Sequence, residues 1–271
     1  MDDARTGSDA LLDIALEAAH AGAEVVRDAA PRRDLRWHEK GVRDFVTEVD
    51  VAAERAISAV IARRAPDAAL LAEEASGHTR PDAPATGVVF VIDPLDGTTN
   101  FLHGYPEYAV SVGVVADGAL VAGVVIDVPL NEVFTARAGG GAHLDGGRIS
   151  VSDVAEPGRA LIGTGFPFRN ADRLDAYPTQ LMRVMERAAG VRRAGSAALD
   201  LASVACGRFD AFWELMLSAW DVAAGILLVR EAGGVCADLV AAPSRVAAAG
   251  IVAGNPVMQR WLLSVLNDNS E

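Results

Sequence analysis

Residues 91–101, VIDPLDGTTNF, decide the fold class of this chain. The run Val88–Ile92 is short and β-branched, as in a strand buried on both faces, and we expect it to end at Asp93 because a proline follows. Gly97 permits a tight turn, and Thr98 begins a run of hydroxyl and amide residues suited to the start of a helix. The stretch therefore predicts a buried strand that delivers Asp93 and Asp96 to an anion-binding helix start, where a cation has to lie between the charges.

Helix-like and strand-like patterns on either side predict a layered architecture. Apolar residues recur at helical spacing from Ser8 to Ala29 and from Thr47 to Arg64, with a polar link between them. Further strands are expected at Ala109–Val115, Leu120–Val128, Glu132–Ala138 and Phe209–Trp213, and further helices at Ala171–Ala189, Ser196–Ala205 and Trp220–Ala232. This order predicts a layered α/β or α+β sandwich in one compact unit, with two parts at residues 1–150 and 151–271.

Composition narrows the classes of function. The chain has 271 residues, 51% of them hydrophobic, which suffices for a substantial core. A net charge of -13 disfavours unaided nucleic-acid binding, and it also means that a site for phosphate must bring its own cations. Cys206 and Cys236 lack metal-ligand spacing, the N-terminus lacks a signal-peptide pattern, and no apolar run approaches the roughly 20 residues that span a bilayer. We expect a cytoplasmic protein that binds neither nucleic acid nor membrane.

Three other segments place acids beside turn or helix-start residues. They are residues 40–50 (KGVRDFVTEVD), 71–74 (LAEE) and 218–225 (SAWDVAAG). Singly, each acid is usually a surface or capping carboxylate. Together with residues 91–101, and in this order, they resemble the inositol monophosphatase family of lithium-sensitive, metal-dependent phosphatases, over about residues 8–255. The resemblance implies a layered αβαβα sandwich of the inositol monophosphatase and fructose-1,6-bisphosphatase type, and a homodimer.

The resemblance also implies Mg²⁺ ions held by carboxylates and one backbone carbonyl, with Mn²⁺ as a substitute. The implied ligands are Glu73, Asp93 and the carbonyl of Leu95 for one ion, and Asp93, Asp96 and Asp221 for a second. Asp50 would lie near the same cluster and help to hold a third, weaker ion. Two carboxylates about 4 Å apart repel by roughly 4 kcal/mol at an effective dielectric constant near 20, so acids that converge in this way require cations.

Roles in catalysis and substrate binding follow from the same resemblance. Thr98 and Glu73 would together orient and deprotonate the attacking water, and the N–H groups of Gly97 and Thr98 would bind the phosphate. The remaining substrate contacts implied are Gly195, Ser196, Ala197, Glu214 and Asp221. A carboxylate such as Glu214 accepts hydrogen bonds from adjacent hydroxyls, although a surface acid at a strand end is the alternative interpretation. Arg192 and Arg193 lie either in the substrate loop or at a subunit interface.

The predicted function is Mg²⁺-dependent hydrolysis of a small phosphorylated alcohol, inositol monophosphate, by in-line attack of an activated water. Other substrates fit the same scaffold, namely histidinol phosphate, fructose 1,6-bisphosphate and 3'-phosphoadenosine 5'-phosphate. An alternative of another class is a partner-binding protein of the transcription machinery, because some bacterial relatives of the family act there.

Overall fold

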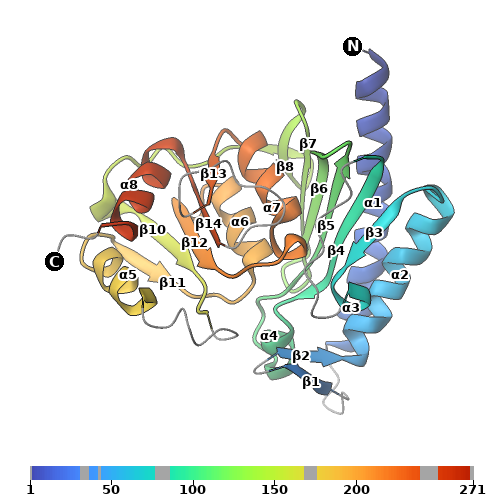
Figure 1. Ribbon diagram of the computed structural model, residues 1–271, viewed down its shortest axis with the longest axis horizontal. Helices are drawn as coiled ribbons and strands as arrows, with labels where there is room; N and C mark the ends of the chain where they lie inside the picture. Colours follow the sequence, from blue (N-terminus) through green and yellow to red (C-terminus); the bar gives the residue numbers. More distant parts are fainter. Residues whose placement is uncertain are drawn as a thin grey trace.

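The computed structural model describes residues 2–30, 37–41, 44–76, 86–167, 176–238 and 250–268. Its elements form five layers, which Figure 1 shows side by side: two helices, a large sheet, two helices, a smaller sheet and two helices. This is the αβαβα sandwich that the resemblance implied. None of the helices in the described residues is both long enough and apolar enough to cross a bilayer.

The helices occupy three of these layers. One outer layer holds α1 (Asp2–Ala29) and α2 (Glu48–Arg64), the central layer α6 (Ala197–Ala205) and α7 (Ala219–Glu231), and the other outer layer α5 (Ala176–Met185) and α8 (Pro256–Leu266). Helix α2 begins after Thr47, whose hydroxyl accepts from the N–H groups of Val49 and Asp50 while the Asp50 carboxylate accepts from the Thr47 N–H. This capping box explains the start of the helix.

The larger sheet has the strand order β3-β4-β5-β6-β7-β8-β9, which is also the order along the chain. The strands are β3 (Ala69–Ala72), β4 (Val88–Asp96), β5 (Ala109–Ala116), β6 (Ala119–Asp127), β7 (Glu132–Arg137), β8 (Gly141–Leu144) and β9 (Gly147–Ile149). Strands β3 and β4 are parallel, and every later neighbour is antiparallel. The central strands are buried on both faces because helices cover each side.

The smaller sheet has the order β11-β10-β12-β14-β13. Its strands are β10 (Leu161–Thr164), β11 (Gly190–Arg192), β12 (Ala211–Leu215), β13 (Val235–Ala237) and β14 (Gly250–Gly254). The remaining elements are β1 (Trp37–Gly41), β2 (Asp44–Thr47), α3 (Glu73–Ser76), α4 (Thr98–His103) and a 3₁₀ turn at Pro157–Arg159. The segment expected to be a polar link thus contains a strand, β1, which pairs with β2.

Several predicted boundaries were wrong. Strand β4 does not end at Asp93 but continues through Pro94 to Asp96, because an irregularity in its register with β5 falls between Asp93 and Asp96. A bulge of this kind tolerates the missing N–H of a proline. Helix α5 ends at Met185 rather than Ala189, because the chain turns there into β11, and the predicted residues 171–175 lie outside the described part. Strand β12 lies two residues later than expected.

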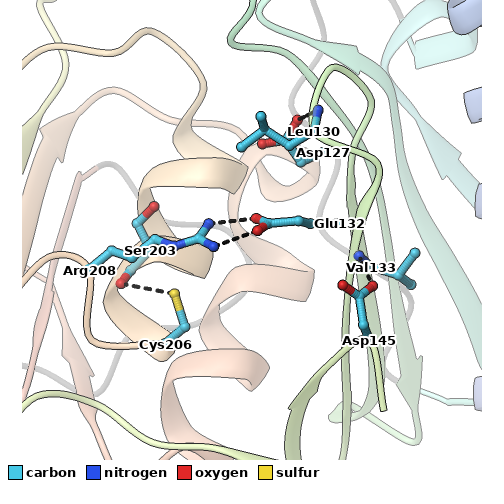
Figure 2. Close-up of polar contacts among 8 residues, drawn as sticks. All are labelled: Asp127, Leu130, Glu132, Val133, Asp145, Ser203, Cys206 and Arg208. Atoms are coloured by element: carbon cyan, nitrogen blue, oxygen red, sulfur yellow. Dashed lines mark hydrogen bonds and ion pairs between the residues drawn. The ribbon is translucent and has the colours of Figure 1, made fainter. Parts of the chain in front are cut away.

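The contacts between the two halves of the chain include the packing of α7 and an ion pair. Helix α7 belongs to the second half but packs on the larger sheet, where a Cβ atom at Gly113 would lie 2.7 Å from the Ala223 Cβ. The guanidinium of Arg208, which follows α6, donates two hydrogen bonds of 2.6 Å to the carboxylate of Glu132 at the start of β7. Figure 2 shows the two groups facing each other across the junction.

Candidate active site

Glu73 and Asp93 lie close together because Glu73 follows β3 and Asp93 lies at the corresponding position of the neighbouring parallel strand β4. Ala72 on β3 is opposite Ile92 on β4, so the residue that follows each of them is an acid at the same end of the two strands. Asp93 is only 2% exposed, and Glu73, the first residue of α3, is partly buried. The Asp93 carboxylate accepts a hydrogen bond of 3.1 Å from the Leu95 N–H. The carboxylates of Glu73 and Asp93 and the backbone at Leu95 therefore lie together at this end of the strands.

Asp96 and Asp221 are fixed by the starts of the two central helices. The Oδ2 atom of Asp96 accepts hydrogen bonds of 2.7 Å from the Ser196 hydroxyl and the Ala198 N–H at the start of α6. Asp221, in the first turn of α7, accepts a 2.5 Å bond from the Ser218 N–H in a capping box. The second half of the chain thus contributes Asp221 and also holds the Asp96 carboxylate through α6.

Thr98 is held from behind by the buried Asp50. Its hydroxyl oxygen lies 3.0 Å from Asp50 Oδ1 and 3.0 Å from the Leu95 carbonyl oxygen. Asp50 is 1% exposed, and its other oxygen caps α2. Gly97 precedes α4 with φ of 94°, a conformation that favours glycine, and a Cβ atom there would lie 2.8 Å from the Glu107 carbonyl oxygen. Both features set the position of the first turn of α4.

One pocket of about 570 Å³ gathers most of the residues predicted from the sequence. Those in its lining are Glu73, Asp93, Leu95, Asp96, Gly97, Thr98, Gly195, Ala197, Glu214 and Asp221. Asp50 and Ser196 are outside the lining: Asp50 contacts Thr98, and Ser196 is buried and contacts Asp96. The structure therefore brings together acids that are up to 148 residues apart in the chain, from Glu73 to Asp221, beside one helix start.

The electrostatics of the pocket centre on Asp93. Burial raises the pKa of its carboxyl group well above the ordinary value, and the negative charges of Glu73, Asp96 and Asp221 raise it further. Among the described residues no group of three or more His, Cys, Asp or Glu side chains is arranged so that it could hold a metal ion as it stands, and oxygens of Asp93 and Asp221 accept backbone hydrogen bonds instead. The donors are nevertheless all carboxylate and carbonyl oxygens, which is the set that Mg²⁺ prefers over softer metals. The residues fit Mg²⁺.

The pocket lining also contains Glu214 and the positively charged Arg193. Glu214 projects from β12 over the backbone of Gly165, where a Cβ atom would lie 1.9 Å from the Glu214 carboxyl carbon. The guanidinium of Arg193 lies 5.4 Å from the ring centre of Phe166, and both residues line the pocket. Arg192 is at the end of β11 and does not line it.

Sequence reasoning missed Phe166 and assigned no role to Asn100. The Asn100 amide donates to the carbonyl oxygens of Glu107 at 2.7 Å and Ala194 at 3.0 Å, and so ties the loop before α6 to the turn after α4. Asn100 lies in the quoted motif, so its position was available as a signal. Phe166 carries no such signal, because its place in the wall depends on the packing of β10 against β12.

The fold is an αβαβα sandwich, and its acid-lined pocket lies where a strand ends and a helix begins. This combination of fold and site is typical of a class of phosphatases. The chain belongs to the inositol monophosphatase family, whose model matches residues 8–271.

Relatives of the family carry two kinds of name. A protein of Pseudomonas aeruginosa named Nus factor SuhB is 45% identical over 259 residues, covering 94% of this chain and 95% of that protein. An inositol-1-monophosphatase of Mesorhizobium japonicum is 41% identical, covering 95% of this chain and 96% of that protein. The crystal structure of extragenic suppressor protein suhB from Bartonella henselae matches with a TM-score of 0.89 and 36% identity, covering 96% of this chain and 100% of that one.

Proposed function

We propose that this protein is a Mg²⁺-dependent phosphomonoesterase that hydrolyses inositol monophosphate. The observation that supports this most strongly is the convergence of Glu73, Asp93, Asp96 and Asp221 on one pocket, where burial raises the pKa of Asp93 and the neighbouring charges raise it further. A buried group of acids is unfavourable by itself and becomes a binding site when divalent cations compensate the charge. Relatives named inositol-1-monophosphatase support the choice of substrate.

In this proposal each residue has a role set by its position. The bound Mg²⁺ ions would polarise the phosphate and activate the attacking water. Glu73 and the Thr98 hydroxyl would orient that water and take up its proton, with Asp50 holding Thr98 in place. The N–H groups of Gly97 and Thr98 would donate to the phosphate. Glu214 would accept hydrogen bonds from the hydroxyls of the sugar alcohol.

A substrate panel tests the proposal. We expect kcat/KM for inositol 1-phosphate to exceed the values for histidinol phosphate, fructose 1,6-bisphosphate and 3'-phosphoadenosine 5'-phosphate. Glu214→Gln should lower kcat/KM for inositol 1-phosphate by about 10-fold, because it weakens a charge-assisted hydrogen bond, and should leave p-nitrophenyl phosphate unaffected. A much higher kcat/KM for histidinol phosphate would overturn the choice of inositol but not of phosphatase.

A second candidate function rests on the relatives named Nus factor SuhB, the first of which is 45% identical to this chain. We propose that the protein also binds a component of the transcription machinery, independently of hydrolysis. A pull-down with RNA polymerase and its elongation factors should recover both the wild type and the Asp93→Asn variant. Recovery of neither would overturn this second function. The homodimer, the cytoplasmic location and the sensitivity to lithium stay predictions.

A further inference from the structure

Strand β5 contains one polar side chain, Ser111, in an otherwise apolar run of eight residues. Ser111 is 0% exposed, and its hydroxyl oxygen has no hydrogen-bond partner among the described residues. Leaving a buried hydroxyl unpaired destabilises the folded state, and an alanine would fill this place in the strand without that cost. The position of Ser111 therefore calls for an explanation other than packing.

The register of the sheet places Ser111 beside Asp93. The two residues are direct partners in the antiparallel pair of β4 and β5, so their side chains stand on the same face with Cβ atoms about 5 Å apart. The next partners on this face, Val91 and Gly113, lie under α7: Val91 packs in a cluster with Ala223, and a Cβ atom at Gly113 would touch Ala223. The orphan hydroxyl is thus enclosed between the central acid of the pocket and the layer formed by α7.

The hydrogen bonds of Asp93 leave a place for this hydroxyl. A carboxyl group has about four lone-pair positions; the Leu95 N–H occupies one of them on Oδ1, and a side-chain hydrogen bond with Glu73 uses another, so positions remain for a further donor. Carboxylates that bind metals are usually held by further hydrogen bonds, which fix their orientation. Ser111 is buried, next to Asp93 and able to donate one.

We propose that Ser111 is a positioning residue of the metal site: its hydroxyl donates a hydrogen bond to the Asp93 carboxylate when that carboxylate holds a divalent cation. This inference rests on the proposed metal site and not on the identity of the substrate. In the metal-free protein the hydroxyl then only destabilises the fold, whereas in the loaded protein it holds a ligand. One substitution should therefore change metal affinity and stability in opposite directions.

The test measures Mn²⁺ affinity by electron paramagnetic resonance of the free ion, and Tm in the absence of metal. Ser111→Ala should bind Mn²⁺ about 10-fold or more weakly than wild type, while its metal-free Tm is equal or higher. Equal affinity in Ser111→Ala and wild type would overturn the role of Ser111 and leave the metal site standing. A wild type that does not bind Mn²⁺ would overturn the metal site, and this proposal with it.

Two controls separate the hydroxyl from general packing. Val112→Ala removes methyl groups on the opposite face of β5, which packs against the core under α1 and α2, and should lower Tm without changing Mn²⁺ affinity. An equal loss of affinity in Val112→Ala would overturn the proposal. If Ser111→Ala does not fold, Ser111→Thr and Ser111→Val are compared instead, because these two side chains have the same shape and differ only in the hydroxyl group. We expect the threonine variant to bind Mn²⁺ more tightly than the valine variant. Equal affinities in this pair would also overturn the proposal.

Discussion

The pocket and the junction between the two halves both gather acids, but their charges are compensated differently. In the pocket, burial raises the pKa of Asp93, and the charges of Glu73, Asp96 and Asp221 raise it further. At the junction, the Arg208 guanidinium binds Glu132 through two hydrogen bonds and holds the pKa of that carboxyl below its usual value (Figure 2). Arg208 compensates the charge of Glu132 directly, whereas under the proposed function cations from solution compensate the acids around Asp93.

Acidic residues are therefore expected to have opposite effects on stability in the two regions. A buried acid that lacks a matching cation destabilises the folded state, and removing its charge should stabilise it. An acid that is paired with an arginine stabilises the folded state, and removing its charge should destabilise it. Substitution of acid by amide in each region tests this difference directly.

The largest effect is expected for Asp93→Asn. Loss of a carboxylate from the centre of the pocket should lower kcat by about 100-fold or more, because the amide binds divalent cations poorly. The same change should raise the Tm of the metal-free protein, since it removes the charge that the neighbouring acids oppose. Steady-state kinetics with Mg²⁺ and thermal denaturation in EDTA measure the two quantities. A lower Tm of the metal-free variant together with an unchanged kcat would contradict the proposed contrast between the two regions.

Asp200 extends the comparison to an acid behind the pocket. It is 1% exposed on α6, and neither carboxylate oxygen has a hydrogen-bond partner among the described residues. Burial raises its pKa well above the ordinary value, the charges of Glu214, Glu107 and Asp96 raise it further, and Arg193 lowers it. A carboxyl whose pKa is raised in the folded state stabilises fully below its unfolded pKa of about 3.9, and this contribution is lost as the pH rises through the folded pKa.

Asp200→Asn should therefore be more stable than wild type at pH 7 by about 1–3 kcal/mol, and the gain should vanish near pH 4. Urea denaturation from pH 4 to 8 measures the difference. Asp210→Asn is the matched control: its buried carboxylate accepts from the Ser152 hydroxyl at 2.6 Å and the Leu161 N–H at 2.7 Å, so this variant should be less stable at pH 7. A gain for Asp200→Asn that does not depend on pH would contradict the explanation.

The parts of the fold that the sequence predicts are those with local causes. Helix α2 follows a capping residue, Thr47, and α6 follows another, Ser196, whose hydroxyl accepts from the Leu199 N–H. The apolar runs of β5, β6 and β7 are separated by turn residues and are visible without any knowledge of their neighbours. The family resemblance then placed the acids of the pocket in one group.

The parts that the sequence does not predict depend on packing between distant segments. Pro94 suggests a strand end, yet the bulge against β5 lets β4 continue. Phe166 and Arg193 reach the pocket wall only because β10, β11 and β12 form one sheet. Ser111 and Asp200 look like ordinary polar residues until the structure shows that their side-chain oxygens are buried and have no hydrogen-bond partner in the described part of the chain.

The smallest effect, and the one that tests the junction, is expected for Glu132→Gln. The carboxylate is 20% exposed and its arginine partner 43% exposed, so solvent screens the pair and we expect a loss of about 1 kcal/mol in the free energy of unfolding at pH 7. Because the pKa of Glu132 is lowered in the folded state, its contribution is present above an unfolded pKa of about 4.3 and is lost as the pH falls through the folded pKa. Urea denaturation at low and high salt measures the change in the free energy of unfolding. Glu17→Gln is the control: it breaks exposed contacts to Arg63 and Arg64 and should change stability less. A gain in stability for Glu132→Gln would show that Arg208 does not compensate this acid, and the contrast with the pocket would disappear.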